Sequence, residues 1–449
     1  MDVNFHPSWR SRFAGIMLVV AVVASSFARS SWAQEAYTPA IRITPIDVEQ
    51  VSFPSPTSCC KQCSVCQSWA CRRCRISCGC PDAYSDGGDA LSTDPRQLDD
   101  PDADPEIGLF DGAQGATPAL AAAQSSFGDF FSGGSKLTSS ALLGGTLGVR
   151  SIVLPLSGGD RRYKLTEHNS PIPQDRVFFN YHHFENALSD AVGNPANLDR
   201  FTFGVEKTFR DGLWSIELRV PFASGLSSDQ NGPTSFGQEF GNIALTFKRL
   251  LHTSECLTVS AGLGVIFPTA DDAAVINGTS SLRMKNEAYH LLPFLGIQWM
   301  PNDCLWVQFF TLADFDLNGN TTTWVIAGGN PRVDNYRDQN LLFIDVSVGY
   351  WLFHCPDECR LLTGLAPIIE LHYSTTLQDT DVFSASGQSA NDNFVSNPFN
   401  RMDVVNLTAG LRAELFGRSY LTVAGVAPLR KGDEKLFDAE FGVQYSLHY

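Results

Sequence analysis

The segment FDAEFGVQYSLHY, residues 437–449, alternates apolar and polar side chains from one end to the other. Successive side chains of a β-strand point to opposite faces, so one face of this segment is apolar and the other is polar. The apolar face holds Phe437, Ala439, Phe441, Val443, Tyr445, Leu447 and Tyr449, and the polar face holds Asp438, Glu440, Gly442, Gln444, Ser446 and His448. A strand with lipid on one side and water on the other requires this pattern. The segment therefore predicts one strand of a transmembrane β-barrel.

The same character recurs along the second half of the chain. Twelve segments have it, near 176–185, 199–210, 213–222, 240–249, 256–267, 288–299, 304–314, 342–353, 361–374, 402–415, 419–427 and 435–449. Most are as long as the roughly 9 to 11 residues that a tilted strand needs to cross a bilayer. Their number is even, as single-chain bacterial barrels require. The predicted fold class is all-β, a twelve-stranded antiparallel transmembrane β-barrel.

The links between these segments alternate in length. Short links near 211–212, 250–255, 300–303, 354–360 and 416–418 interleave with long ones near 186–198, 223–239, 268–287, 315–341 and 375–401. Only the last outer loop, 428–434, is short. Outer-membrane barrels have short periplasmic turns and longer outer loops, so both barrel termini are expected on the periplasmic side. A soluble β-sandwich also alternates, but its strands usually have about 5 to 6 residues. The link rhythm favours the barrel over the sandwich.

The N-terminus predicts export. Arg10 and Arg12 precede an apolar stretch from Phe13 to Ala24 and a small-residue site ending at Ala33, which is typical of a signal peptide at residues 1–33. An uncleaved helical anchor is the alternative, although the apolar stretch is shorter than the roughly 20 residues that a spanning helix needs. In an exported protein, cysteines are expected to be oxidised.

Composition divides the rest of the chain. Residues 34–81 form a cysteine-rich segment expected in the periplasm, and residues 82–126 form an acidic linker too poor in apolar residues to fold. Residues 127–175 are predicted to be a barrel lead-in or a plug in the lumen, and residues 176–449 the barrel. The formal net charge of −16 disfavours nucleic acid as a partner.

The chain resembles the outer-membrane β-barrel (porin-like) superfamily through the strand and link rhythm after Arg176. It is also similar to a group of uncharacterised secreted bacterial barrel proteins in which a stretch like His168–Tyr181, HNSPIPQDRVFFNY, leads into the first strand. The resemblance covers about the last 60% of the chain. It implies an outer-membrane location, contact with membrane lipid, and passive passage of small polar solutes through a porin-like channel.

Other functions remain open at this stage. A plugged structural or surface-anchoring barrel would link the membrane to periplasmic or cell-wall partners. A barrel-embedded hydrolase is disfavoured because no Ser/His/Asn arrangement at phospholipase-like spacing is present, and neither a phosphate loop nor a nucleophile elbow occurs. We therefore expect no enzyme activity, no catalytic residues and no cofactor.

Ionisable residues on the polar faces are the candidate lumen lining. Rings of such groups set ion selectivity in pores, and acidic groups outnumber basic ones here. Glu370 and His372 share a face and could both ligate a metal ion, but two residues alone do not form a metal site. The predicted lumen-lining residues are Glu206, Glu217, Arg219, Lys248, Asp345, Glu370, His372, Arg412, Glu414, Asp438 and Glu440.

Twelve cysteines form two groups. The first lies in one short basic segment, where local disulfides or a zinc site of CxxC pairs would both fit: Cys59, Cys60, Cys63, Cys66, Cys71, Cys74, Cys78 and Cys80. The second lies beside the short links: Cys256, Cys304, Cys355 and Cys359. A disulfide within the second group is predicted, with Cys355–Cys359 or Cys256–Cys304 as the candidate bridge.

One loop resembles half of a calcium site. Asp314, Asp316 and Asn318 have the spacing of the first half of a calcium-binding loop at residues 314–320, but Val325 stands where the bidentate Glu is expected. An ordinary turn is the alternative to calcium at this place.

Overall fold

A computed structural model describes residues 124–129, 134–138, 151–155, 164–189, 194–226, 229–230, 237–277, 279–325, 330–355, 360–378, 383–384, 394–396 and 403–449. These residues form strands and one short 3₁₀ turn, η2 (Gly432–Glu434). No helix in the described ranges is long and apolar enough to cross a membrane.

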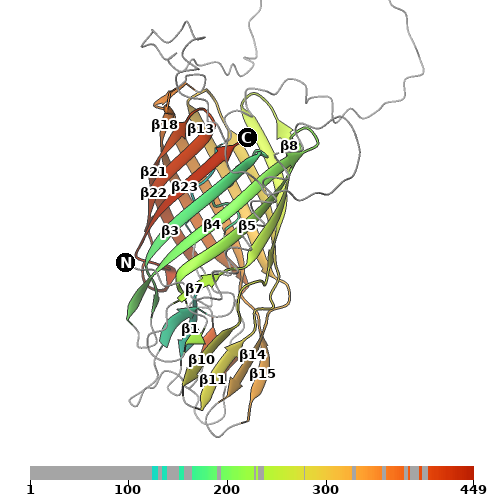
Figure 1. Cartoon of the computed structure of the whole chain (residues 1–449), viewed down its shortest axis with the longest axis vertical. Coiled ribbons are helices and arrows are strands. Elements are labelled where there is room, and N and C mark those ends of the chain that lie inside the picture. The colour runs from blue at the N-terminus through green and yellow to red at the C-terminus, as the bar shows by residue number, and fades with distance from the viewer. Residues whose placement is uncertain are drawn as a thin grey trace, which may run out of the picture. The chain divides into compact units, whose positions relative to one another are not determined.

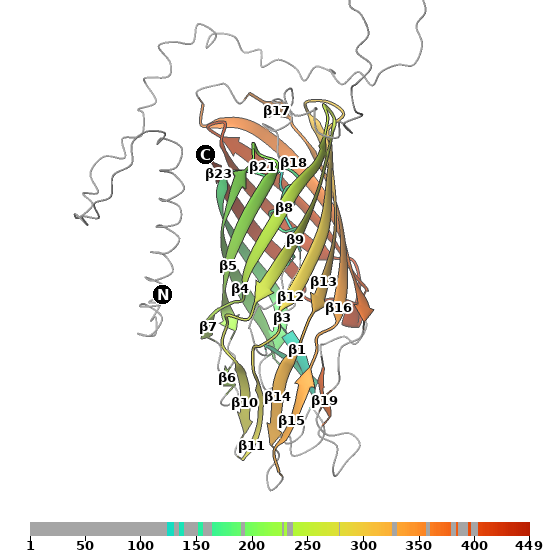
Figure 2. The same ribbon diagram turned by 90° about the vertical axis from the view of Figure 1, so that its right-hand side faces the viewer.

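Twelve antiparallel strands close into a barrel (Figures 1 and 2). They are β3 (Arg176–Ser189), β4 (Pro195–Phe209), β5 (Trp214–Leu226), β8 (Ile243–Thr253), β9 (Leu257–Phe267), β12 (His290–Trp299), β13 (Leu305–Asp316), β16 (Asn340–Tyr350), β18 (Leu362–Gln378), β21 (Asp403–Leu415), β22 (Ser419–Pro428) and β23 (Ala439–His448). Each pairs with its neighbours, and β23 pairs with β3 to close the ring. The twelve predicted segments are therefore confirmed as barrel strands.

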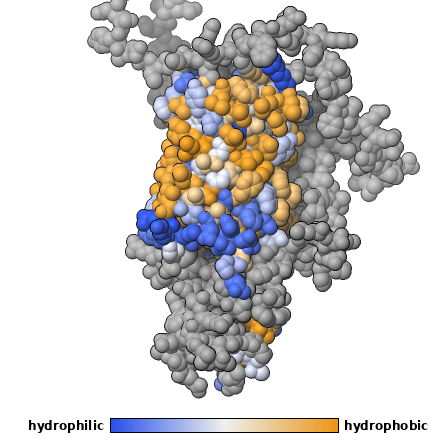
Figure 3. All heavy atoms as spheres, turned by 90° about the vertical axis from the view of Figure 1, so that its left-hand side faces the viewer, coloured by the Kyte–Doolittle hydropathy of each residue, from blue (hydrophilic) through white to orange (hydrophobic). Residues whose placement is uncertain are grey.

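The wall alternates between an apolar outside and a polar inside. Along β13 the burial pattern alternates between buried and half-buried positions for ten residues. On the outside, Ile369, Leu371 and Leu411 are each about half exposed, as are other large apolar side chains. Figure 3 shows a largely hydrophobic surface over one side of the barrel wall, with hydrophilic residues toward one end. Water would not stabilise so much exposed apolar wall, but lipid would.

The two ends of the barrel differ. Five short links, together with Tyr449, lie at one end, here called the short-link end. Aromatic side chains gather on its outer surface, including Trp299 and Tyr350, which are each about half exposed. Aromatic residues favour the boundary between lipid and water, so this rim marks one edge of the membrane.

The long links at the other end, the long-link end, are not plain loops. Five of their strands form a sheet in the order β15 (Arg332–Tyr336), β14 (Asn320–Val325), β11 (Ser280–Met284), β10 (Ala273–Asn277) and β6 (Asp229–Gln230). A second sheet has the order β19 (Phe383–Ser384), β20 (Phe394–Ser396), β1 (Gly134–Thr138) and β2 (Ser151–Pro155). Two small strands extend the barrel sheet, β7 (Gly237–Phe240) beside β5 and β17 (Phe353–His354) beside β18. None of these small strands was predicted from the sequence.

The sequence misplaced the start of the last strand. β23 begins at Ala439, so the alternation does not extend to the two residues before it. Phe437 is buried against Phe184, with ring centroids 5.3 Å apart, rather than facing lipid. Asp438 is about half exposed and pairs with Lys435 at the long-link end.

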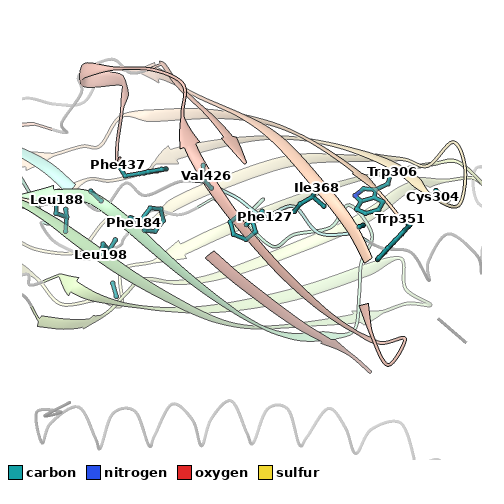
Figure 4. Close-up of a cluster of buried hydrophobic side chains, with 14 residues drawn as sticks. Phe127, Phe184, Leu188, Leu198, Cys304, Trp306, Trp351, Ile368, Val426 and Phe437 are labelled. Atoms are coloured by element: carbon teal, nitrogen blue, oxygen red, sulfur yellow. The ribbon is translucent and has the colours of Figure 1, made fainter. Parts of the chain in front are cut away.

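Buried apolar side chains sit inside the barrel as well. One cluster joins Phe184, Leu188 and Leu198 near the long-link end to Trp306 and Trp351 near the short-link end, with Phe127 between them (Figure 4). Phe127 does not belong to the wall. It comes from a segment that precedes the first barrel strand, and this segment defines the interior.

Candidate functional site

Ten of the eleven residues predicted to line the lumen are buried in the barrel interior. Each is at most 3% exposed: Glu206, Glu217, Arg219, Lys248, Asp345, Glu370, His372, Arg412, Glu414 and Glu440. The exception is Asp438, whose side chain is 47% exposed. Its prediction was wrong because it assumed strand geometry one residue before the strand begins.

Near the short-link end the wall residues form a connected set of ion pairs. Arg176 on β3 binds Glu206 at 2.8 Å and Glu217 at 2.9 Å. Lys248 on β8 binds Glu206 at 3.0 Å, and Arg219 binds Glu217 on the same strand. Burying a charge is costly unless it is paired and hydrogen-bonded, so this arrangement is stable only because each group has an opposite partner.

Two segments of the chain before β3 occupy the lumen; we call them together the plug, residues 124–129 and 164–175. All described plug residues except Asp175 are buried. The two segments bind each other: Ser126 N donates to Asn169 O at 3.0 Å, and His168 N donates to Ser126 O at 2.8 Å. Neither segment forms a regular strand, so some of their backbone groups are satisfied within the plug and others by side chains of the wall.

The first plug segment is held by polar contacts to four wall strands. Phe127 N donates to both oxygens of Glu370 on β18, at 2.8 and 3.0 Å. Gln308 Nε2 on β13 donates to Gln124 O at 2.6 Å, and Arg412 Nη1 on β21 donates to Gln124 Oε1 at 2.7 Å. Gln444 Nε2 on β23 donates to Phe127 O. These four strands lie in one half of the ring, from β13 through β18 and β21 to β23.

The second plug segment carries a buried carboxylate. Glu167 pairs with Arg200 on β4, accepts a hydrogen bond from Asn180 Nδ2 at 3.1 Å, and lies 3.3 Å from His182 Nε2. Arg219 Nη1 donates to the backbone oxygen of the same residue at 2.6 Å. This residue therefore places a negative charge of the plug against a buried cation of the wall.

Lys164 joins both plug segments to the wall. Its ammonium pairs with Asp129 in the first plug segment and with Asp345 on β16, the latter at 2.9 Å. Asp345 also accepts a hydrogen bond from Thr166 Oγ1 at 2.7 Å and pairs with His372 at 2.8 Å. Asp129, Asp345 and His372 have the composition of a metal site. The lysine ammonium is already the cation at their centre, so this cluster is a latch rather than a metal centre.

Glycines in the wall and plug make room for these contacts. A Cβ on Gly442 would lie 2.5 Å from Phe127 Cζ, and one on Gly264 would lie 1.9 Å from Leu165 Cδ1. Gly128 has a φ of +93°, and a Cβ there would lie 2.6 Å from Glu167 Cγ. Only glycine tolerates both the backbone conformation and the crowding at residue 128. The plug and the wall are thus complementary in shape as well as in charge.

Sequence reasoning missed several interior residues. Arg176, Arg200 and His182 are buried wall residues, and Lys164 and Glu167 belong to the plug. The wall residues sit on predicted strands, and extending the alternation of β3 and β4 would have placed them inside. Nothing in the sequence indicates the partners of the plug residues, because the contacts join segments as far apart as Phe127 and Glu370.

A polar, charged interior inside an apolar, closed wall decides what the molecule is. The chain is a transmembrane β-barrel. Closed barrels are one of the two structures that can cross a bilayer, because closure satisfies every backbone hydrogen bond within the sheet. No protein-family model matches the barrel, and no curated protein matches it.

Solved structures of other barrels are similar to the wall. A KdgM porin in complex with disordered oligogalacturonate matches 61% of this chain and 99% of its own, at 8% identity and a TM-score of 0.31. An outer membrane channel from Pseudomonas putida F1 matches 62% and 96%, at 10% identity and a TM-score of 0.40. The beta domain of the Bordetella autotransporter BrkA matches 62% and 100%, at 12% identity and a TM-score of 0.38. These scores are low, so our conclusions rest on the barrel's own geometry.

The cysteines beside the short links do not pair as predicted. Cys304 and Cys355 are each disulfide-bonded, whereas Cys256 is a free thiol. The predicted Cys256–Cys304 bridge is therefore wrong. Cys304 is buried in the apolar cluster beside Trp306, while Cys256 is partly exposed at the rim. Cys359 lies outside the described residues, so the Cys355–Cys359 bridge stays a prediction.

The three candidate calcium ligands each have different hydrogen-bond partners. Asp314 is buried, and its Oδ1 forms a hydrogen bond of 2.7 Å with His290 Nδ1. Asp316 Oδ1 accepts hydrogen bonds from the backbone of Asn318 at 3.1 Å and Gly319 at 2.7 Å, as in a tight turn. Asn318 Oδ1 accepts from Tyr289 N at 2.9 Å. Calcium binding by these three residues stays untested.

Several predictions fall on residues that the structure does not describe. They are the signal peptide, the eight cysteines at 59–80 with their zinc alternative, and the linker up to residue 123. The described plug begins at Gln124, three residues before the predicted boundary.

Proposed function

We propose that this barrel is a porin-type outer-membrane channel for small polar solutes, and that the plug must move before solutes pass. The supporting observation is the chemistry of the interface between plug and wall. Hydrogen bonds and ion pairs dominate it, and water can replace such contacts when the plug leaves. A permanent filling would be expected to use the apolar packing that stabilises protein cores most simply.

The wall that a displaced plug would leave behind is polar and weakly acidic. Buried side chains on the twelve strands include seven acidic groups, Glu206, Glu217, Asp314, Asp345, Glu370, Glu414 and Glu440, and five basic ones, Arg176, Arg200, Arg219, Lys248 and Arg412. Fixed charges in a narrow pore set ion selectivity. An open channel would therefore prefer cations weakly, and neutral polar solutes would pass without a specific site.

A plugged anchoring barrel is the second candidate, because one observation favours it. Most of the described lumen charges are buried and ion-paired in the plugged state, and pulling a buried charge from its partner costs several kcal/mol. A barrel held shut in this way could serve only to tether the membrane to a periplasmic or wall partner. The orientation, with the short-link end in the periplasm, follows from the usual pattern of barrel links and belongs to both candidates.

Single-channel recording in planar bilayers separates the two. The full chain should give rare openings with a slight preference for cations, and variants with a weakened plug should open more often. If neither the wild type nor a folded plug variant conducts, the channel proposal fails and the anchoring barrel stands. We also expect solutes to pass through the barrel without being chemically converted. In liposome uptake assays the solutes should therefore be recovered unchanged.

A further inference from the structure

A second group of metal-ligating residues lies at the long-link end, away from the plug. It combines His290 at the start of β12, Asp316 at the end of β13, and Asp338 just before β16. One ligand atom from each residue lies within 4.8 Å of the others. His290 and Asp316 face each other directly across the β12–β13 pair, which fixes two of the three ligands on rigid strands.

The imidazole of His290 is oriented as a metal ligand is. Its Nδ1 lies 2.7 Å from Asp314 Oδ1, so the carboxylate holds the proton on that nitrogen and leaves Nε2 with a lone pair. Nε2 has no hydrogen-bond partner, although the residue is only 1% exposed. A buried acceptor without a partner is costly, and a bound cation would satisfy it.

The two carboxylates are positioned by the backbone. Asp316 Oδ1 accepts two backbone amides of its own turn, and Oδ2 accepts Asp338 N at 2.8 Å. A carboxylate has about four lone-pair sites, so Asp316 keeps capacity for a metal while being held in place. Asp316 is also half-buried, in contrast to the buried His290.

The latch cluster provides an internal comparison. It too contains two aspartates and a histidine, but Lys164 supplies a cation between its carboxylates at 2.9 Å from Asp345. At the long-link end, the protein group on the imidazole is instead another carboxylate, Asp314. Asp314, Asp316 and Asp338 thus place three carboxylates near one imidazole.

We propose that His290, Asp316 and Asp338 bind a divalent transition metal, with Zn²⁺ as the expected ion and Asp314 as the positioning residue of the histidine. One imidazole nitrogen and two carboxylate oxygens, with water as a fourth ligand, form a set that Zn²⁺ accepts. The metal would connect the long-link ends of β12, β13 and β16. In the chain, β14 follows β13 and β15 precedes β16. The site would thus stabilise the five-stranded sheet that contains β14 and β15, and it does not depend on whether the barrel conducts.

The test is Co²⁺ titration of the full chain, purified in detergent under oxidising conditions and stripped with a chelator, with Zn²⁺ as competitor. We expect visible d–d absorption from one site of nitrogen and oxygen ligands, displaced by Zn²⁺. His290→Gln and Asp338→Asn should each abolish that absorption. Asp314→Asn should weaken Co²⁺ binding about 10- to 100-fold, because it removes the group that orients the imidazole.

His372→Gln is the matched control, because it alters the histidine of the latch and should leave Co²⁺ binding unchanged. Asp338 lies outside the barrel strands, so Asp338→Asn keeps the test valid if the His290 variant does not fold. The proposal is overturned if both variants titrate like the wild type. It is also overturned if the absorption shows thiolate-to-metal charge transfer alone, because the metal would then be held by cysteines.

Discussion

Replacing Lys164 by Met tests the latch between plug and wall most sharply. Methionine has a similar length, so the substitution removes the ammonium and little volume. Asp129 and Asp345 then face each other without the cation that now pairs with both. Removing one partner of a buried ion pair costs about 3 to 5 kcal/mol. This cost raises the free energy of the plugged state. When the plug is displaced, its carboxylate lies in water, so the open state does not carry the same cost.

The expected shift in the equilibrium follows from that cost. About 3 kcal/mol corresponds to roughly a hundredfold change in an equilibrium constant. The open probability of Lys164→Met in planar bilayers should therefore rise about a hundredfold or more over the wild type. Adding Asp129→Asn should reverse much of the rise, because it removes one of the two carboxylates that lose the ammonium of Lys164.

Lys207→Met is the matched control. Lys207 pairs with Asp175 at 2.6 Å, but both side chains are 25% exposed at the short-link end. A solvent-exposed pair contributes about 0 to 1 kcal/mol, so the open probability should change less than about fivefold. Equal open probabilities for Lys164→Met and the wild type, with both barrels folded, would refute the latch.

Three further predictions concern the wall, the plug and the thiols. Leu411→Lys puts a charge on the lipid face and should lower the free energy of unfolding in lipid, measured by urea titration, by about 2 to 4 kcal/mol. The control Val333→Lys, on exposed β15 at the long-link end, should change it by less than about 0.5 kcal/mol. Gly128→Ala should raise the open probability, because the new Cβ would collide with Glu167 and force the two plug segments apart; Gly212→Ala, where φ is also positive but a Cβ meets nothing within 4 Å, should not. Peptide mass spectrometry should find Cys256 alkylated without reductant and the disulfide-bonded cysteines beside it alkylated only after reduction.

Local periodicity explains why the barrel could be predicted from the sequence. Each strand must present apolar side chains to lipid and polar ones to the lumen, so the wall repeats one local rule twelve times. The rule fails where the strand ends, as at Asp438. It also says nothing about long links, where short strands such as β10 and β11 are stabilised by pairing with each other and with β14.

The interior could be predicted only in part, for a different physical reason. Burial of Glu370 follows from alternation on β18, but its partner is a backbone amide 243 residues earlier in the chain. The match between Glu167 and Arg200 likewise depends on how the plug enters the lumen. Such contacts leave no periodic signal, since one carboxylate in an irregular segment resembles any other.

Heat-modifiable migration of the membrane-extracted full chain tests the central claim most directly. A closed barrel resists detergent until it is boiled, so we predict that the protein fractionates with the outer membrane and migrates faster before boiling than after. A chain that remains soluble in the periplasm, with the same mobility before and after boiling, would contradict the transmembrane barrel and every proposal that depends on it.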